Sequence, residues 1–170
     1  MQQQQVKALT NIISKLRIFH GLNLNEAGRL LKICGSRVYQ PSEVIYHAGE
    51  PSQEIYILLQ GGLKAVGKAG TTLGEILPGA SCGEMGVFSG RNRSATVVAT
   101  QKCLGFVITK QDLKTLLSAD PEMNVKVLQN MVELLSERLE DADTSIESHA
   151  VRLKQVQDEH GLTSDLDKGV

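Results

Sequence analysis

Residues 82–97 of this chain are CGEMGVFSGRNRSATV, a stretch that combines an apolar helix signal with glycines, one acid and two arginines. Gly83 and Glu84 open the helix signal, and Arg93 stands where the next strand pattern begins. A helix N-terminus presents unpaired backbone amides and a partial positive charge, which suit a phosphate group. Arg93 can add a bidentate, charge-assisted contact to the same anion, with the Ser94 hydroxyl beside it. We therefore expect this stretch to bind a phosphate.

The acid in this stretch points to the rest of the ligand. A carboxylate repels a phosphate, so Glu84 is expected to face the other end of the ligand and to accept a hydrogen bond from a hydroxyl. A carboxylate for a sugar hydroxyl and a guanidinium for a phosphate together describe a nucleotide. Arg91 stands at the tip of the loop and is expected to be exposed. The alternative is that Glu84 and Arg93 are solvated surface residues, as isolated charged loop residues usually are.

The segment from residue 36 to residue 109 alternates short β-favouring runs with turn residues. Many short strands at this spacing favour an antiparallel sandwich or roll, whose closure limits exposed edges. Gly61 and Gly62 separate two of the runs at the length of a two-residue hairpin. The predicted strands are Arg37–Tyr39, Val44–Tyr46, Ile55–Leu59, Leu63–Val66, Thr71–Ile76, Ala95–Thr100 and Cys103–Ile108.

Helical patterns flank this segment. Apolar residues at three- and four-residue spacings predict two N-terminal helices, one over residues 6–16 and one over residues 22–33. Asn23 or Asn25 is expected to cap the second helix, and Gly35 lies just past its predicted end. After the last strand, Lys110–Leu117 is predicted to form a short helix.

The last helix is predicted to be long and to dimerise. Asp120-Pro121-Glu122 has the cap residue, the proline and the first-turn acid of a helix start. An apolar seam follows over five heptads, which favours a two-stranded coiled coil. The alternative, a helix folded back on its own domain, leaves the later seam residues without a partner. The seam is Val125, Leu128, Val132, Leu135, Leu139, Ala142, Ile146, Leu153 and Val156.

The predicted organisation therefore has four parts. An N-terminal helical segment (residues 1–35) precedes a β-roll with a short helix (36–119), a long dimerisation helix (120–160) and a disordered tail (161–170).

Composition narrows the class of protein. With 41% apolar residues and a net charge of −1, the chain has no global field that would attract nucleic acid or an anionic membrane. Three widely spaced cysteines indicate a reducing compartment. No signal peptide and no 18-residue apolar run is present, so we expect a cytoplasmic protein without membrane insertion. Scattered histidines and the lack of a nucleophile–base pattern predict neither a metal site nor enzyme activity.

The ordered motifs resemble the cyclic-nucleotide-binding domain family, especially its bacterial catabolite activator branch. The resemblance covers roughly residues 18–139, and its centre is the pair of segments Gly83–Phe88 and Arg93–Ala95. It implies an α+β fold in which an antiparallel β-roll, or jelly roll, is flanked by N-terminal helices and a long C-terminal dimerisation helix. It also implies that Glu84 accepts the ribose 2′-hydroxyl and that Arg93 binds the cyclic phosphate. Ser94 and the backbone amides around Gly83 and Met85 would complete the phosphate site.

The resemblance also implies how the base of the nucleotide is contacted and what kind of partner lies downstream. The family contacts the base from the start of the long helix, where this chain has Arg138 among leucines. Ser94 beside Arg93 favours cAMP, and cGMP or a dinucleotide stays open. The chain ends without a helix-turn-helix after the long helix, so we expect no direct DNA binding and a protein partner downstream. The alternatives to a cyclic-nucleotide sensor are a dimerisation module with a vestigial pocket and a regulatory fragment of a larger protein.

Overall fold

The computed structural model describes residue 13 and residues 16–159, which fall into two compact units on either side of the Asn130–Met131 bond. The long helix α5 (Pro121–Glu159) begins in the first unit and forms the described part of the second. The first unit begins with a short 3₁₀ turn η1 (Arg17–Phe19) and helix α2 (Leu24–Lys32). It continues with β1 (Gly35–Tyr39), β2 (Val44–Tyr46), β3 (Glu54–Gln60), β4 (Leu63–Val66), β5 (Thr72–Ile76), β6 (Ser81–Cys82), α3 (Glu84–Ser89), β7 (Thr96–Ala99), β8 (Cys103–Thr109) and α4 (Lys110–Ser118).

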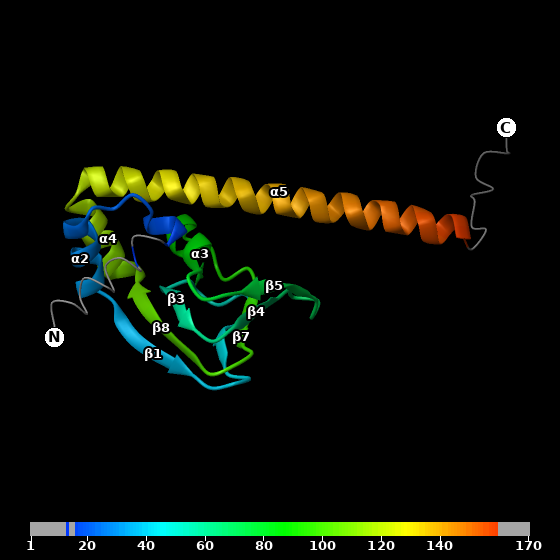
Figure 1. Cartoon of the computed structure of the whole chain (residues 1–170), viewed down its shortest axis with the longest axis horizontal. Helices are drawn as coiled ribbons and strands as arrows, with labels where there is room; N and C mark the ends of the chain where they lie inside the picture. Colours follow the sequence, from blue (N-terminus) through cyan, green and yellow to red (C-terminus); the bar gives the residue numbers. More distant parts are fainter. Residues whose placement is uncertain (1–12, 14–15, 160–170) are drawn as a thin grey trace. The chain divides into compact units, whose positions relative to one another are not determined.

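The strands form two antiparallel four-stranded sheets, in the orders β1-β8-β3-β6 and β2-β7-β4-β5 (Figure 1). This confirms the predicted antiparallel roll. Both sheets contribute to one hydrophobic core, which removes their inward-facing side chains from water. Its buried members are Tyr46, Tyr56, Leu58, Leu63, Cys82, Val97, Ala99, Cys103 and Val107.

Gly61 and Gly62 do not form the predicted hairpin, because β3 and β4 lie in different sheets. The two glycines instead connect one sheet to the other. Gly61 has a φ of +96°, and a Cβ there would stand 2.5 Å from the carbonyl oxygen of Lys102 and 2.8 Å from Cys103 Sγ. A positive φ and a close backbone approach both require glycine. The residue type was therefore a sound turn signal, but the strand pairing that it suggested was wrong.

The predicted helix over residues 22–33 is α2, and Asn23 is its cap. The Asn23 side chain accepts from the Glu26 amide (2.9 Å), while the Glu26 carboxylate accepts from the Asn23 amide (2.7 Å). Gly35, three residues past the end of α2, is the first residue of β1. Strand β6, only Ser81–Cys82, was not predicted, because two residues carry no periodicity. The helix predicted over residues 6–16 lies almost entirely outside the described residues.

Polar contacts join α2 and η1 to the first turns of α5 within the first unit. The buried Glu26 carboxylate accepts from Lys126 Nζ (2.8 Å), and Arg29 donates to Asp120 (2.9 Å). Asp120 also accepts from the Met123 amide (3.0 Å), so it caps α5 as predicted. This amide, helped by the Arg29 guanidinium, holds the pKa of the Asp120 carboxyl below its usual value. The start of α5 is therefore positioned by the N-terminal helix.

The first turns of α5 have a buried apolar face in addition to the predicted seam. Val125 and Leu128 are exposed, but Met123 and Val127, four residues apart on another face, are fully buried in the first unit. The first turns of α5 therefore carry two apolar faces, one in the core and one open to solvent. No helix in the described part of the chain has the length and apolar character to cross a membrane.

The close packing of β8 against β3 gives a test of the fold. A Cβ at Gly105 would overlap the carbonyl oxygen of Ile57 and the ring of Tyr56, while a Cβ at Gly74 in β5 meets no atom within 4 Å. We expect Gly105→Ala to lower the free energy of unfolding by about 1–3 kcal/mol, because the well-packed strands must move apart. Gly74→Ala is the control and should change it by less than about 1 kcal/mol. Urea unfolding followed by circular dichroism measures both; equal effects would contradict the packing.

Candidate functional site

Arg93 occupies the connection between α3 and β7, and its backbone is bonded to a distant turn. The Arg93 amide donates to the carbonyl of Glu50 (2.8 Å), and the Arg93 carbonyl accepts from the Gly49 amide (2.9 Å). The Gly49-Glu50 turn between β2 and β3 therefore sets the position of Arg93. These two backbone bonds leave the side chain directed into the protein, where it is only 6% exposed.

The Arg93 guanidinium is held by backbone carbonyls. Nη1 donates to the carbonyl of Gly83 (3.0 Å) and Nη2 to the carbonyl of Glu54 (2.7 Å). Nε is buried and has no hydrogen-bond partner among the described residues, and none of their carboxylates forms an ion pair with the guanidinium. A buried charge without a counter-charge is unfavourable. The arrangement therefore favours an anion that replaces the carbonyls.

Tyr46, from β2, lies under this guanidinium. The Arg93 Cζ atom stands 3.5 Å from the centre of the Tyr46 ring, a cation–π geometry. The tyrosine is 5% exposed, and its hydroxyl donates to the carbonyl of Glu54 (3.4 Å). Burial raises the pKa of the Tyr46 phenol far above its usual range, so the ring stays neutral. Tyr46 was not among the site residues predicted from the sequence, because an aromatic residue in a strand does not indicate a contact with an arginine 47 residues further along the chain.

Two glycines of the cassette, the segment 83–95, make its close packing possible. Gly83 caps α3 with a φ of +88°, and a Cβ there would overlap Arg93 Nη1. A Cβ at Gly86 would overlap Ser52 Oγ, from the connection before β3. The Ser52 hydroxyl is buried and has no hydrogen-bond partner among the described residues. Ser52 is a second residue that sequence reasoning missed, since a serine in a loop is ordinary.

Glu84 is the first residue of α3, and its side chain is completely buried. The hydroxyl of Ser81 donates to one of its carboxylate oxygens at 3.5 Å, at the long limit of a hydrogen bond. Glu84 follows directly in sequence on Gly83, whose carbonyl accepts a hydrogen bond from Arg93. Glu84, Gly83 and Arg93 thus lie in one neighbourhood, with the acid inside the protein rather than on its surface.

The remaining predicted site residues are more open. Met85 is 39% exposed on α3, and Ser94, next to Arg93, is exposed. Arg91 is also exposed and lies outside the regular elements. Arg138 is an exposed residue of α5 in the second unit, and its contact with a base stays a prediction. The described residues contain no cluster of three or more histidines, cysteines or acids that could hold a metal ion.

Known proteins share this sequence in part. The chain is 25% identical over 138 residues to glutaminase 1 of Bradyrhizobium diazoefficiens, which covers 81% of the chain and 22% of that protein. It is 28% identical to the cyclic AMP receptor protein of Thermus thermophilus, over 76% of the chain and 60% of that protein. The chain spans about a fifth of the length of the first curated relatives that it matches.

The fold also resembles that of solved structures. A cyclic nucleotide-binding domain from Methylobacillus flagellatus superimposes with a TM-score of 0.75 at 23% identity, over 86% of this chain and 84% of that one. The sequence model of the cyclic nucleotide-binding domain matches residues 36–120, from the start of β1 to the cap of α5. That region contains both sheets, the buried arginine and the helix α3. The chain belongs to the cyclic nucleotide-binding domain family.

Proposed function

We propose that this protein senses a cyclic nucleotide, cAMP in the first place, and that Arg93 binds the cyclic phosphate. The proposal rests on one observation: the guanidinium is buried, its Nε has no acceptor among the residues that the structure describes, and its other nitrogens donate there to neutral carbonyls. A phosphate would exchange these carbonyls for charge-assisted hydrogen bonds, which are roughly twice as strong. Because Arg93 is buried, ligand entry requires the Gly83 turn to move away from it.

Glu84 would bind the sugar. Glu84 is buried and follows directly in sequence on Gly83, whose carbonyl accepts from Arg93, so a ribose attached to a phosphate at the arginine would lie near this residue. The backbone amides around Gly83 and Met85 would donate to the phosphate, as expected at a helix start. Ser94 is exposed beside Arg93 and would add its hydroxyl. Arg138 would approach the base, in cis or from a second copy.

The choice of cAMP rests on Ser94 and on one relative. The Thermus protein that resembles this chain over 134 residues is named a cyclic AMP receptor protein. cGMP is the alternative ligand. We infer a regulatory rather than an enzymatic role, in the cytoplasm, with a protein partner that responds to α5. One relative is named a glutaminase, so domains of this kind also occur in enzymes. This chain matches about a fifth of the length of that protein.

The output would pass through α5. The connection between α4 and α5, residues 119–120, is short, and Asp120 within it accepts from both the Met123 amide and Arg29. A ligand shifts such a junction only by its different affinity for the two helix arrangements, typically about 1–3 kcal/mol. In the second unit, α5 exposes apolar residues at heptad spacing, which supports pairing with a second copy. These residues are Val132, Leu135, Leu139, Ile146, Leu153 and Val156.

The role of Arg93 is tested by calorimetry with cAMP and cGMP. Arg93→Ala should weaken nucleotide binding by about a hundredfold or more, because charge-assisted hydrogen bonds contribute about 1.5–3 kcal/mol each. Arg91→Ala is the matched control and should bind as the parent does, because Arg91 is exposed. Arg93→Lys, which keeps the charge, guards against a folding defect. Interchanged results would assign the phosphate to Arg91, and no heat with either nucleotide at high micromolar concentration would indicate a vestigial pocket.

The role of Glu84 is tested with a ligand that lacks the 2′-hydroxyl. The parent protein should bind cAMP about tenfold more tightly than 2′-deoxy-cAMP, since a hydrogen bond to a charged group contributes about 1.5–3 kcal/mol. Glu84→Gln should lose most of this preference and bind 2′-deoxy-cAMP about as the parent does. A preference of the same size in both proteins would place the ribose elsewhere. Because both ligands are measured on each protein, a variant that merely binds both ligands more weakly would keep the preference for cAMP.

Dimerisation is tested by sedimentation of the full chain. The parent should sediment as a two-chain species at micromolar concentration, and Ile146→Glu should sediment as a monomer, because a buried charge in the seam has no partner. Thr144→Glu adds the same charge on the same helix but off the seam, and it should stay dimeric. A monomeric parent, or a monomer with both variants, would exclude this seam as the interface.

A further inference from the structure

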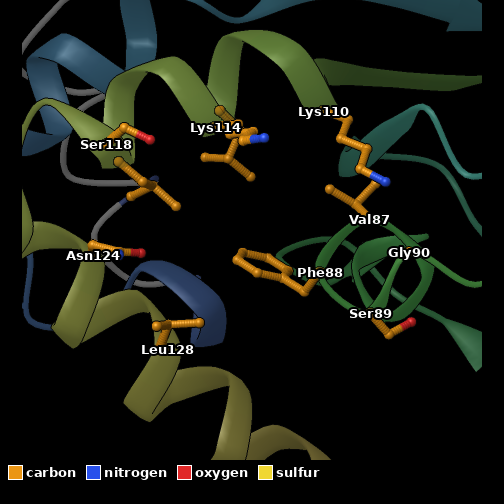
Figure 2. Close-up of a pocket in the computed structure, with 11 residues that line it drawn as sticks. Val87, Phe88, Ser89, Gly90, Lys110, Lys114, Ser118, Asn124 and Leu128 are labelled. Carbon is orange, nitrogen blue, oxygen red and sulfur yellow. The ribbon is translucent and has the colours of Figure 1, made fainter.

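A second cavity lies on the far half of the cassette helix. It has a volume of about 410 Å³, within the range of small-molecule sites, and it opens between the end of α3, the helix α4 and the first turns of α5 (Figure 2). All of its lining residues belong to the first unit. Gly83, Glu84 and Arg93 are not among them. The cavity therefore lies outside the phosphate site and is not explained by cyclic-nucleotide binding.

Most of the cavity wall is apolar. Val87 and Phe88 come from α3, Leu113 and Leu117 from α4, and Leu128 from α5. In Figure 2 the Phe88 ring extends from α3 toward the residues of α5. Leu128 is 45% exposed, so apolar surface here remains in contact with water. An alkyl chain in the cavity would cover this surface, and the burial of apolar surface favours binding.

The charged groups of the wall are all of one sign. Lys110 and Lys114 stand one helical turn apart on α4 and both line the cavity, whereas no acidic residue does. Neither ammonium group pairs with a carboxylate in the described part of the chain. Ser118 and Asn124 add hydrogen-bonding groups at the opposite end of α4 and on α5 (Figure 2). The wall thus offers an apolar interior with a positive rim.

We propose that this cavity binds a small amphipathic carboxylate, an unbranched fatty acid of about eight to ten carbons. The alkyl chain would lie against Phe88, Leu117 and Leu128, and the carboxylate would contact Lys110 and Lys114. Octanoate, with about ten non-hydrogen atoms, occupies roughly 300 Å³ if each takes about the volume of a water molecule. That volume fits within the 410 Å³ of the cavity. An inorganic anion would leave the apolar walls without a contact, and a cationic ligand would be repelled by the two lysines.

The test uses the full chain and octanoate, with octylammonium as a probe of equal length and opposite charge. Calorimetry should show saturable octanoate binding and at least about tenfold weaker octylammonium binding. Lys110→Ala/Lys114→Ala should weaken octanoate binding about fivefold or more, as expected for the loss of two partly exposed charge contacts. Lys68→Ala/Lys102→Ala, which removes two charges from turns of the β-roll, should leave octanoate binding unchanged.

Nuclear magnetic resonance can show that octanoate binds in this cavity rather than elsewhere on the protein. The chain has three phenylalanines, so nuclear Overhauser contacts from the octanoate methylenes to the ring of Phe88 can be assigned with Phe88→Leu. Contacts to Phe88 and the loss of affinity in the first lysine pair support the proposal. Absence of octanoate binding at millimolar concentration, equal binding of octylammonium, or equal effects of the two lysine pairs would overturn it. None of these results depends on nucleotide binding, so the two proposals fail separately.

Discussion

The arrangement of this domain depends on a buried guanidinium that rests on backbone carbonyls and one aromatic ring. Arg93 donates to the carbonyls of Gly83 and Glu54 and lies 3.5 Å above the ring of Tyr46. It forms no ion pair with a carboxylate of the described residues. The protein therefore keeps a strong cation inside its core at a net cost, which an anionic ligand would offset.

Closure of the roll brings the partners of Arg93 together. Tyr46 belongs to one sheet and Glu54 to the other, while Gly83 begins the helix between β6 and β7. The connection at Gly61 moves the chain from one sheet to the next, and its close approach to Lys102 leaves no space for a side chain. Glycine at such a close backbone approach allows the two sheets to pack together, and this packing brings Tyr46 under Arg93.

Helix α3 contributes to both the arginine site and the cavity. Its first residues adjoin the arginine, and its last residues, Val87 and Phe88, form one wall of the cavity that α4 and α5 complete. The start of α5 is bonded to α2 by the Glu26–Lys126 and Arg29–Asp120 pairs. The cavity and the start of α5 therefore both adjoin the helix that begins at the arginine site.

The sequence alone determined the elements and the chemistry of the cassette. Short β-favouring runs between turn residues located seven of the eight strands, helical patterns located α2, α4 and α5, and the spacing of Gly83, Glu84 and Arg93 identified the stretch that contains the candidate site. Local pattern cannot specify which strands pair, so the supposed hairpin at Gly61 proved to be a connection between sheets. Only the tertiary structure placed Tyr46, Ser52 and the carbonyl of Glu54 around the cassette, and only it formed the lysine-rimmed cavity. Contacts between residues distant in sequence depend on how the sheets close and pack, and no periodicity records that.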